Sequence, residues 1–306
     1  MTFEKKSLPG RIWFHRQVYV LLLPGILYYV IFCYVPMAGL QLAFKQFNAR
    51  LGIWGSRWVG LLNYTFVIRD PAFWRAMINT VTISIQRLIF QFPVPIILAL
   101  LINEFSPRRY KRILQTIYTF PHFLSWVIIA GIMFNLLEAN GLINNTLMAL
   151  GFGSVNFLTS QKLIRPLLYI TENWKSSGWA AIIYLAAISG IEMEQYESAI
   201  IDGASRFQRM IYITLPGISV TIIVMLILSI GNIMNAGFDQ IFNMGNAVIQ
   251  GDIDILDWYI YRITFQGPAD FGFSTAISLL KAAINFTFLL TANQLAKMIT
   301  GTGLFI

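Results

Sequence analysis

The chain has 306 residues, of which 57% are hydrophobic and only 12% are charged. A soluble domain carries about a quarter charged residues, so this chain has too little polar surface for a water-soluble globule, whereas a bilayer accepts apolar surface. The net charge of +8 does not indicate nucleic acid, because the cations are scattered between apolar runs and do not gather on one polar face.

Six stretches are long and apolar enough to cross a bilayer as helices, since a core of about 30 Å needs roughly 20 residues. In chain order they are Val18–Tyr34, Asn79–Ile102, Ile113–Leu137, Arg165–Ile191, Gly217–Phe238 and Phe273–Ala296. We expect Pro36 to close the first, and Pro24, Pro93 and Pro95 to kink the first two. The sequence therefore predicts an all-α integral membrane protein with about six transmembrane helices.

The order of these stretches predicts three parts. Residues 1–17 form an N-terminal cytoplasmic or interfacial segment, residues 18–296 a six-helix transmembrane domain with a cytoplasmic loop at 192–216, and residues 297–306 a cytoplasmic tail. The polar start leads into an apolar stretch without a small-residue cleavage site, so we expect the first helix to be retained. Cys33 is the only cysteine, which excludes an internal disulfide.

Basic residues near the helix ends place the N-terminus in the cytoplasm, because Lys and Arg favour that side. On this orientation the cytoplasmic cations are Lys5, Lys6, Arg11, Arg16, Arg108, Arg109, Lys111, Arg112, Arg206, Arg209 and Lys297. The external ones are Lys45, Arg50, Arg57, Arg69, Lys162 and Arg262. More basic residues therefore lie on the predicted cytoplasmic side than on the external side, although the first external loop is itself basic.

Residues 192–216 are the longest polar stretch on the predicted cytoplasmic side. Their start holds three glutamates, Glu192, Glu194 and Glu197. Negative charge at a helix start complements the helix dipole, and Gly203 after a short helical run can take the positive φ of a sharp turn. A second short helix running to Pro216 is expected to place three apolar side chains on one face: Phe207, Met210 and Ile211.

Three short strings stand at fixed spacing in this stretch: Glu197-Ser198-Ala199, Asp202-Gly203-Ala204 and Ile213-x-Leu215-Pro216. They resemble the cytoplasmic "EAA" loop of binding-protein-dependent ABC importer permeases, with Ser198 in place of an alanine. The likeness extends over nearly the whole chain to maltose-type sugar permeases of the MetI-like superfamily, especially those of oligo- and polysaccharide importers such as alginate-type systems. Supporting stretches lie at residues 58–63, 73–80, 95–104 and 303–305.

The resemblance implies a fold, a role and partners. The fold is that of a MetI-like permease in the bacterial cytoplasmic (inner) membrane, and the loop is the coupling helix that seats in a cleft of an ATPase subunit. The implied contacts are Glu197, Ser198, Ala199, Asp202, Gly203, Ala204, Phe207, Leu215 and Pro216. The implied partners are a second similar permease subunit, two ATP-binding cassette ATPase subunits and an extracytoplasmic sugar-binding protein, besides the lipid bilayer.

The sequence offers no residues for catalysis. It contains no G-x-x-x-x-G-K-[ST] phosphate loop, so ATP and Mg²⁺ are expected to be used by a partner subunit, and this chain is expected to bind no cofactor. His15 and His122 are the only histidines and have no second histidine at ligand spacing, so no metal site is expected. We predict a non-catalytic membrane subunit without a nucleic-acid partner.

Charges inside predicted spans are costly and are functional hypotheses by default. The three here are Arg87, Lys175 and Lys281. Lys175 follows three residues that could offer a sugar hydrogen bonds and a stacking ring: Glu172, Asn173 and Trp174. A Glu172 to Lys175 pair, or snorkelling of the lysine, is the alternative.

Asn232 and Asn235 stand one turn apart in the fifth span. They could line the same path, or they could form hydrogen bonds between helices. An acidic cargo such as a uronate oligomer is favoured if all three intramembrane cations line the path.

Two other classes of membrane protein remain possible at this point. An ion-driven secondary transporter would also be helical and polar inside, but it would often show an internal repeat or buried carboxylates for coupling, and neither is strong here. A membrane scaffold without transport is the second alternative.

Overall fold

The computed structural model describes residues 14–105 and 107–300, which form helices joined by loops and one small hairpin. These described residues divide into two compact units, residues 14–67 with 269–279 and residues 68–268 with 280–300. Most of the predicted N-terminal segment, with Lys5, Lys6 and Arg11, lies outside the described residues. So do the last six residues of the predicted tail, with the stretch at 303–305.

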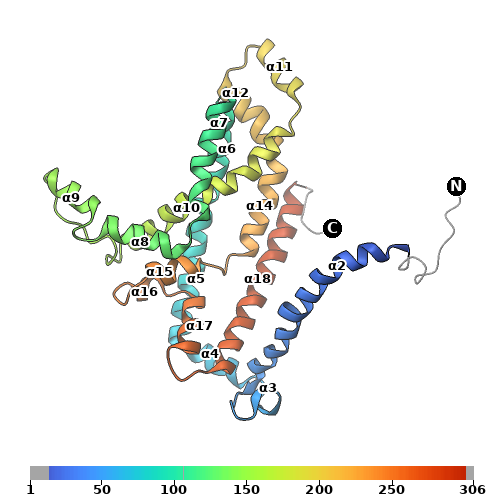
Figure 1. Cartoon of the computed structure of the whole chain (residues 1–306), viewed down its shortest axis with the longest axis vertical. Helices are drawn as coiled ribbons and strands as arrows, with labels where there is room; N and C mark the ends of the chain where they lie inside the picture. Colours follow the sequence, from blue (N-terminus) through green and yellow to red (C-terminus); the bar gives the residue numbers. More distant parts are fainter. Residues whose placement is uncertain (1–13, 106, 301–306) are drawn as a thin grey trace. The chain divides into compact units, whose positions relative to one another are not determined.

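The first unit contains one long helical run (Figure 1), in which an α-helix, a π-helix and a 3-10 helix follow one another without a break. Helix α2 (Arg16–Tyr29) continues as the π-helix η1 (Val30–Tyr34) and the 3-10 helix η2 (Val35–Phe44). The predicted stop at Pro36 is therefore wrong. Pro36 stands at the start of η2, where a proline is tolerated because the backbone N–H groups there need no helical partner.

The remainder of the first unit is a short hairpin. Strand β1 (Lys45–Gln46) pairs antiparallel with β2 (Arg57–Trp58), and α3 (Gly52–Gly55) lies between them in the chain. The hairpin leads to α4 (Leu62–Arg69), whose buried Asn63 amide donates to the carbonyls of Ala43 and Lys45 at 3.0 Å each. This amide fastens α4 to the end of η2.

The second unit holds the other helices. Its first half contains α5 (Pro71–Gln91), α6 (Pro93–Glu104), α7 (Arg108–Thr119), η3 (Phe120–Phe123), α8 (Trp126–Leu137), α9 (Leu142–Ala149) and α10 (Ile164–Ser189). Its second half contains α11 (Met193–Ile201), α12 (Arg206–Arg209), η4 (Met210–Thr214), α13 (Leu215–Gly217), α14 (Ser219–Gly231), α15 (Phe238–Met244), α16 (Gln250–Ile253) and α17 (Leu256–Phe265). Helix α18 (Phe271–Thr300) begins in the first unit and ends in the second.

The prediction of an all-α membrane protein is confirmed. Within the described residues, four helical runs are long and apolar enough to cross a membrane: Arg16–Phe44, Pro71–Glu104, Trp126–Ala149 and Phe271–Met298. The number rises to six if two bent pairs each count as one span, Ile164–Ser189 with Met193–Ile201, and Arg206–Gly217 with Ser219–Gly231.

The third predicted span is not one continuous helix. Helix α7 ends at Thr119, the 3-10 turn η3 begins with Phe120 and Pro121, and α8 starts only at Trp126. Pro121 cannot extend α7 because it lacks a backbone N–H. Ser125 then caps α8 by accepting a hydrogen bond from the N–H of Ile128, so the chain begins a new helix.

The other boundaries differ less. The second predicted span begins earlier, because Asp70 caps a helix whose first residue is Pro71 and accepts from the N–H of Ala72. It is interrupted between α5 and α6 at Phe92, just before Pro93, where a kink was predicted. The fifth is shorter than predicted, since α14 ends at Gly231.

Helix α10 is the centre of the second unit, with α5, α6 and α7 packed against it. Gly178 permits a close approach between α10 and α7, because a Cβ at this position would lie under 3.0 Å from the backbone of Tyr118 in α7. Beside it, the rings of His122 and Trp179 stack with centroids 4.7 Å apart. These contacts fix α10 relative to the turn between α7 and α8.

Polar side chains fasten α16 and α17 to α5 and α10. The Arg165 guanidinium donates to Asn79 Oδ1 at 2.9 Å and to the carbonyl of Asp252 at 2.8 Å. Thr80 Oγ1 accepts from the N–H of Leu256 at 2.8 Å. Tyr259 donates to Asp70, and burial, followed by that carboxylate, raises the pKa of its phenol. The beginning of α10 is thus anchored to α5 and α16 by charge-assisted hydrogen bonds.

Candidate functional site

The polar segment 192–217, here called the elbow, turns sharply at Gly203. Glu192 is the N-cap residue of α11 and Glu194 lies in its first turn, as expected from the charges. Gly203 has φ +78°; its N–H donates to the carbonyl of Ile200 at 3.0 Å. The N–H of Ala204 donates to the carbonyl of Ala199 at 2.8 Å. This pair of bonds is the Schellman motif that ends a helix, and it needs a residue that accepts the left-handed conformation.

The second half of the elbow is fixed by its own cap and by a cross-link. Ser205 and Gln208 form a reciprocal capping box at the start of α12. The hydroxyl groups of Tyr196 and Thr214 are 2.9 Å apart, which joins α11 to η4, and Thr214 is buried. The elbow is therefore braced by local hydrogen bonds.

The apolar surface of the elbow differs from the one predicted. Phe207 is 68% exposed, but Met210 packs against the cluster around Ile218, and Ile211 is half-buried. The three residues therefore do not form one exposed face. The chain changes from α- to π-helical geometry at Met210, which alters the side-chain register.

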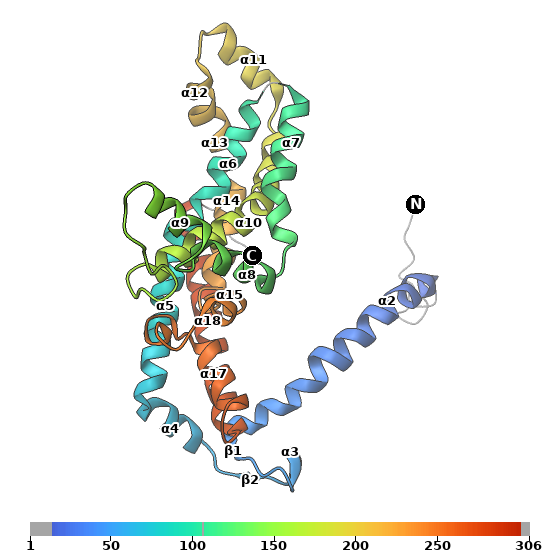
Figure 2. The ribbon, with the colours of Figure 1, turned by 60° about the vertical axis from the view of Figure 1, so that its left-hand side comes forward.

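The exposed apolar side chains of the elbow come from both of its helical parts. They are Met193, Ile200, Ile201, Phe207 and Tyr212, with Ile201 85% exposed. Helix α11 of the elbow lies beyond the end of α6 and the start of α7 in both ribbon views (Figures 1 and 2). The elbow thus presents exposed apolar side chains on a segment held by local hydrogen bonds, and such a surface suits contact with another protein.

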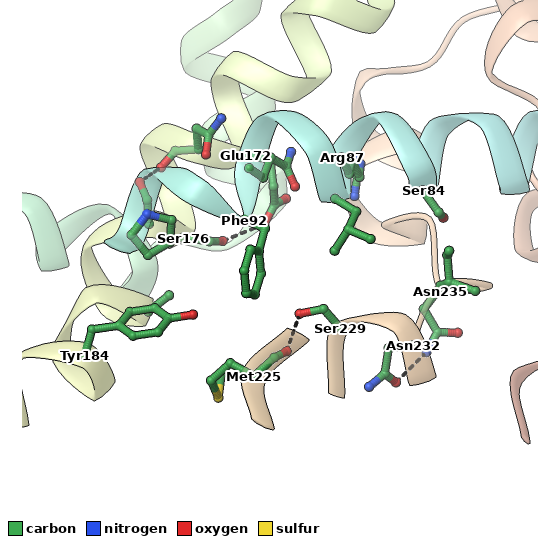
Figure 3. A pocket seen from close by; sticks show the side chains of 17 residues that line it. Ser84, Arg87, Phe92, Glu172, Ser176, Tyr184, Met225, Ser229, Asn232 and Asn235 are labelled. Atoms are coloured by element: carbon green, nitrogen blue, oxygen red, sulfur yellow. Dashed lines mark hydrogen bonds between the residues drawn. The ribbon is translucent and has the colours of Figure 1, made fainter. Parts of the chain in front are cut away.

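A polar cavity of about 300 Å³ lies between α5, α10 and α14 (Figure 3). It is lined by Ser84, Arg87, Leu88, Gln91, Phe92, Pro95, Glu172, Asn173, Ser176, Ser177, Ala180, Tyr184, Met225, Ser229, Asn232, Ile233 and Asn235. Five of the eight residues predicted for a substrate path are among them: Arg87, Glu172, Asn173, Asn232 and Asn235. Amides, hydroxyls and one charge of each sign thus line this cavity together with apolar side chains.

Arg87 is held from behind by a fully buried glutamine. Its Nη2 donates to Gln240 Oε1, and Gln240 Nε2 donates to the carbonyl of Leu168 at 2.8 Å and to Thr171 Oγ1 at 2.7 Å. The guanidinium also lies against Gly237, where any Cβ would collide with it. Gly237 has φ +80°, so the position favours glycine for two reasons.

The opposite charge on the cavity comes from α10. Glu172 Oε1 accepts a hydrogen bond from Ser176 Oγ at 2.6 Å, and Glu172 lines the same cavity as Arg87. Asn232 Oδ1 accepts from Asn235 Nδ2 at 3.2 Å on the other wall. The cavity can therefore offer both donors and acceptors to a polar ligand.

Several polar atoms at this cavity have no partner. Among the buried side-chain atoms of the described residues that lack a hydrogen bond are Ser84 Oγ, Arg87 Nε, Gln91 Nε2 and Asn173 Oδ1, all from lining residues. Buried polar atoms are nearly always paired with protein or water. Their concentration at one cavity is what a site for a hydroxyl-rich ligand or for water requires.

The other three predicted path residues lie elsewhere. Lys175 Nζ donates to the carbonyls of His122 at 2.8 Å and Leu124 at 2.6 Å, over the ring of Trp126, and Trp174 is exposed. Lys281 forms an ion pair of 2.6 Å with Asp257 in α17. None of these three lines the cavity, and their place on a substrate path stays a prediction.

Among the polar lining residues of α5 and α14, the sequence prediction missed Ser84, Gln91 and Ser229. Ser84, Arg87 and Gln91 stand at i, i+3 and i+7 on α5, and Ser229 stands one turn before Asn232 on α14. Polar residues at helical spacing inside an apolar span share one face, and this signal was present. Gln240 carried no such signal, because its role depends on the packing of α15 against α10.

The apolar helices, the elbow and the cavity with polar side chains between them together define a membrane transport subunit. Residues 91–301 match the family described as "binding-protein-dependent transport system inner membrane component", and the chain belongs to that family. The prediction of an ABC importer permease is thereby confirmed, and the ion-driven secondary transporter is not favoured.

Similar proteins agree with this assignment. Protein LplB of Bacillus subtilis is 42% identical over 95% of this chain and 91% of its own length. The polygalacturonan/rhamnogalacturonan transport system permease protein YteP of the same organism is 38% identical over 99% of this chain and 94% of its own.

A solved bacterial ABC transporter involved in the import of the acidic polysaccharide alginate contains a similar chain. It is 38% identical, with a TM-score of 0.88 over 96% of this chain and 99% of that one. A second structure of the alginate transporter, in complex with alginate pentasaccharide-bound periplasmic protein, gives the same identity and TM-score over 97% of this chain. The MetI-like permease fold is confirmed by this likeness.

Proposed function

We propose that this chain is one permease subunit of an ATP-driven importer of acidic oligosaccharides. The observation that supports an acidic cargo is the position of Arg87, which Gln240 holds at a cavity whose other polar lining side chains include amides, hydroxyls and Glu172. A guanidinium matches the geometry of a carboxylate and can bind it with two parallel hydrogen bonds. The names of YteP and of the alginate importer, which both refer to acidic polysaccharides, support the same cargo class.

Glu172 makes the cavity suitable for sugars in particular. A carboxylate accepts hydrogen bonds from sugar hydroxyls, while Arg87 supplies the donor for a uronate carboxylate. Because the two charges largely offset each other, a neutral oligosaccharide is the competing cargo.

The elbow carries the proposed coupling to an ATPase. The predicted contact residues from Glu197 to Phe207 flank the turn at Gly203, and Phe207 is exposed, whereas Leu215 and Pro216 lie in α13. The proposed assembly contains this chain, a second permease, two ATPase subunits that use ATP and Mg²⁺, and an external sugar-binding protein. In this proposal the chain lies in the bacterial inner membrane with its N-terminus and its elbow on the cytoplasmic side.

Reconstituted uptake tests the cargo. Proteoliposomes with the purified assembly would receive uronate oligomers and carboxyl-reduced oligomers of the same length. We expect the wild type to prefer the uronates, and Arg87→Gln to lose about 10- to 100-fold of that preference in kcat/KM, because a hydrogen bond to a charged group contributes roughly 1.5–3 kcal/mol. Arg87→Lys should retain part of it, since an ammonium binds without the planar fork.

The exposed Arg57→Gln variant is the control and should behave as wild type. If neutral oligosaccharides are carried and uronates are ignored, the acidic cargo is excluded. If Arg87→Gln keeps the uronate preference, the cavity is not where the carboxylate is recognised, whereas membership of the importer family stands.

A further inference from the structure

Four cations occur within five residues at the start of α7. They are Arg108, Arg109, Lys111 and Arg112, here called the basic turn. Between Asp70 and Glu138 the chain contains only one acidic residue, Glu104. The local net charge is therefore strongly positive where the chain leaves α6.

The described cations of this turn lack anionic partners. Arg109 and Arg112 are exposed, and neither ion pair of the described residues includes them or Lys111, whose Nζ donates to the neutral Asn103 Oδ1 at 2.9 Å. Positive charges in the first turn of a helix oppose the helix dipole, and like charges at i, i+3 or i, i+4 repel. An external anion would relieve both effects.

Apolar side chains surround the basic turn. Phe105, Tyr110, Ile113 and Ile117 are all 45% or more exposed. Helix α7 thus begins with exposed cations and continues with exposed apolar residues, as helices do where they enter a bilayer from the headgroup region. Figure 2 shows the start of α7 at the same end of this unit as the elbow, next to the end of the apolar helix α6.

We infer that the basic turn binds the phosphates of anionic phospholipid headgroups, with phosphatidylglycerol as the representative ligand. The candidate membrane span Pro71–Glu104 ends just before the basic turn, and the exposed apolar residues of α7 follow it. The neighbour of both segments is therefore the bilayer. Clusters of cations at such a level attract anionic lipids and leave zwitterionic ones unbound.

Lipid binding by the purified full-length chain tests this inference. Native mass spectrometry from detergent would compare retained phosphatidylglycerol with phosphatidylcholine for the wild type and for Arg109→Gln/Arg112→Gln. Each cation near an anionic surface contributes about fivefold in affinity, so we expect the double variant to lose about 30-fold of the preference for phosphatidylglycerol. Arg50→Gln/Arg57→Gln, which removes two exposed arginines of the first unit, should keep it.

Three controls separate the explanations. The melting temperature of the double variant in phosphatidylcholine should equal that of the wild type, which shows that it is folded. Soluble glycerol phosphate should not displace the lipid, and displacement would mean that the turn is a site for free phosphate. Equal retention of both lipids by the wild type, or an unchanged preference in the double variant, refutes the inference. Loss of ATPase co-purification with lipid binding intact would assign the turn to a protein partner and overturn it as well.

Discussion

Replacing Gly178 by alanine should separate α7 from α10. A Cβ at this position would lie 2.9 Å from the backbone nitrogen of Thr119 and nearer still to the carbonyl group of Tyr118. Ordinary contact begins at about 3.4 Å, so the helices must part by at least about 0.5 Å. Backbone atoms cannot rotate away as a side chain does, and a gap of this size removes a quarter or more of the dispersion energy between the facing atoms.

The expected cost is about 3 kcal/mol. Overpacking of a tight interior costs roughly 1–3 kcal/mol, and the stack of His122 on Trp179 beside the contact adds about 1 kcal/mol if it is lost. The free energy of unfolding would be measured in mixed micelles with increasing sodium dodecyl sulfate. Gly131→Ala is the matched control, because a Cβ there meets nothing within 4 Å and should stabilise the helix by about 1 kcal/mol. If the free energy of unfolding of Gly178→Ala lies within about 0.5 kcal/mol of the wild-type value, the close approach of α7 and α10 is refuted.

Two further variants test the elbow and the ion pair of α18. Gly203→Val should reduce the sugar imported per ATP hydrolysed, because a β-branched residue at φ +78° distorts the turn, while Gly203→Asn should be milder. Normal coupling by the valine variant in proteoliposomes would count against the assigned turn. Lys281→Met should cost about 2 kcal/mol of unfolding free energy by leaving Asp257, 26% exposed, unpaired. The double variant with Asp257→Leu should recover more than half of it, and a double variant as unstable as the sum of both singles would show that the ion pair is not the reason.

The elbow could be predicted from sequence because its geometry is local. Gly203 needs positive φ, the glutamates begin a helix, and these effects act within a few residues of the chain. The helical spans were visible for the same reason, since hydropathy and length decide them. The exposed face of the elbow was not predictable, because it depends on the π-helical turn that begins at Met210 and on the packing of Met210 against the cluster around Ile218.

Some residues of the cavity could be predicted from the sequence and others could not, because only some of them are conspicuous inside an apolar span. Charged and amide side chains inside apolar spans are unusual, so Arg87 and Asn232 stood out in the sequence. The same criterion also selected Lys175, whose ammonium donates hydrogen bonds to the backbone carbonyls of His122 and Leu124 at the break after α7. A cation that satisfies backbone carbonyls and one that faces a cavity look alike until the helices are placed.

Helix α10 connects three features that have been described separately. It is anchored by Arg165 near its start, contributes Glu172 to the cavity, and ends at Ser189, just before the elbow. At 1.5 Å per residue, Glu172 lies about 10 Å and Ser189 about 36 Å from the anchor along the axis. For a rotation about Arg165, a displacement of about 3.5 Å at the elbow moves the cavity wall by only about 1 Å. A rigid α10 that pivots at Arg165 would thus act as a reducing lever, because a displacement at the elbow would become a movement of the cavity wall about 3.5-fold smaller.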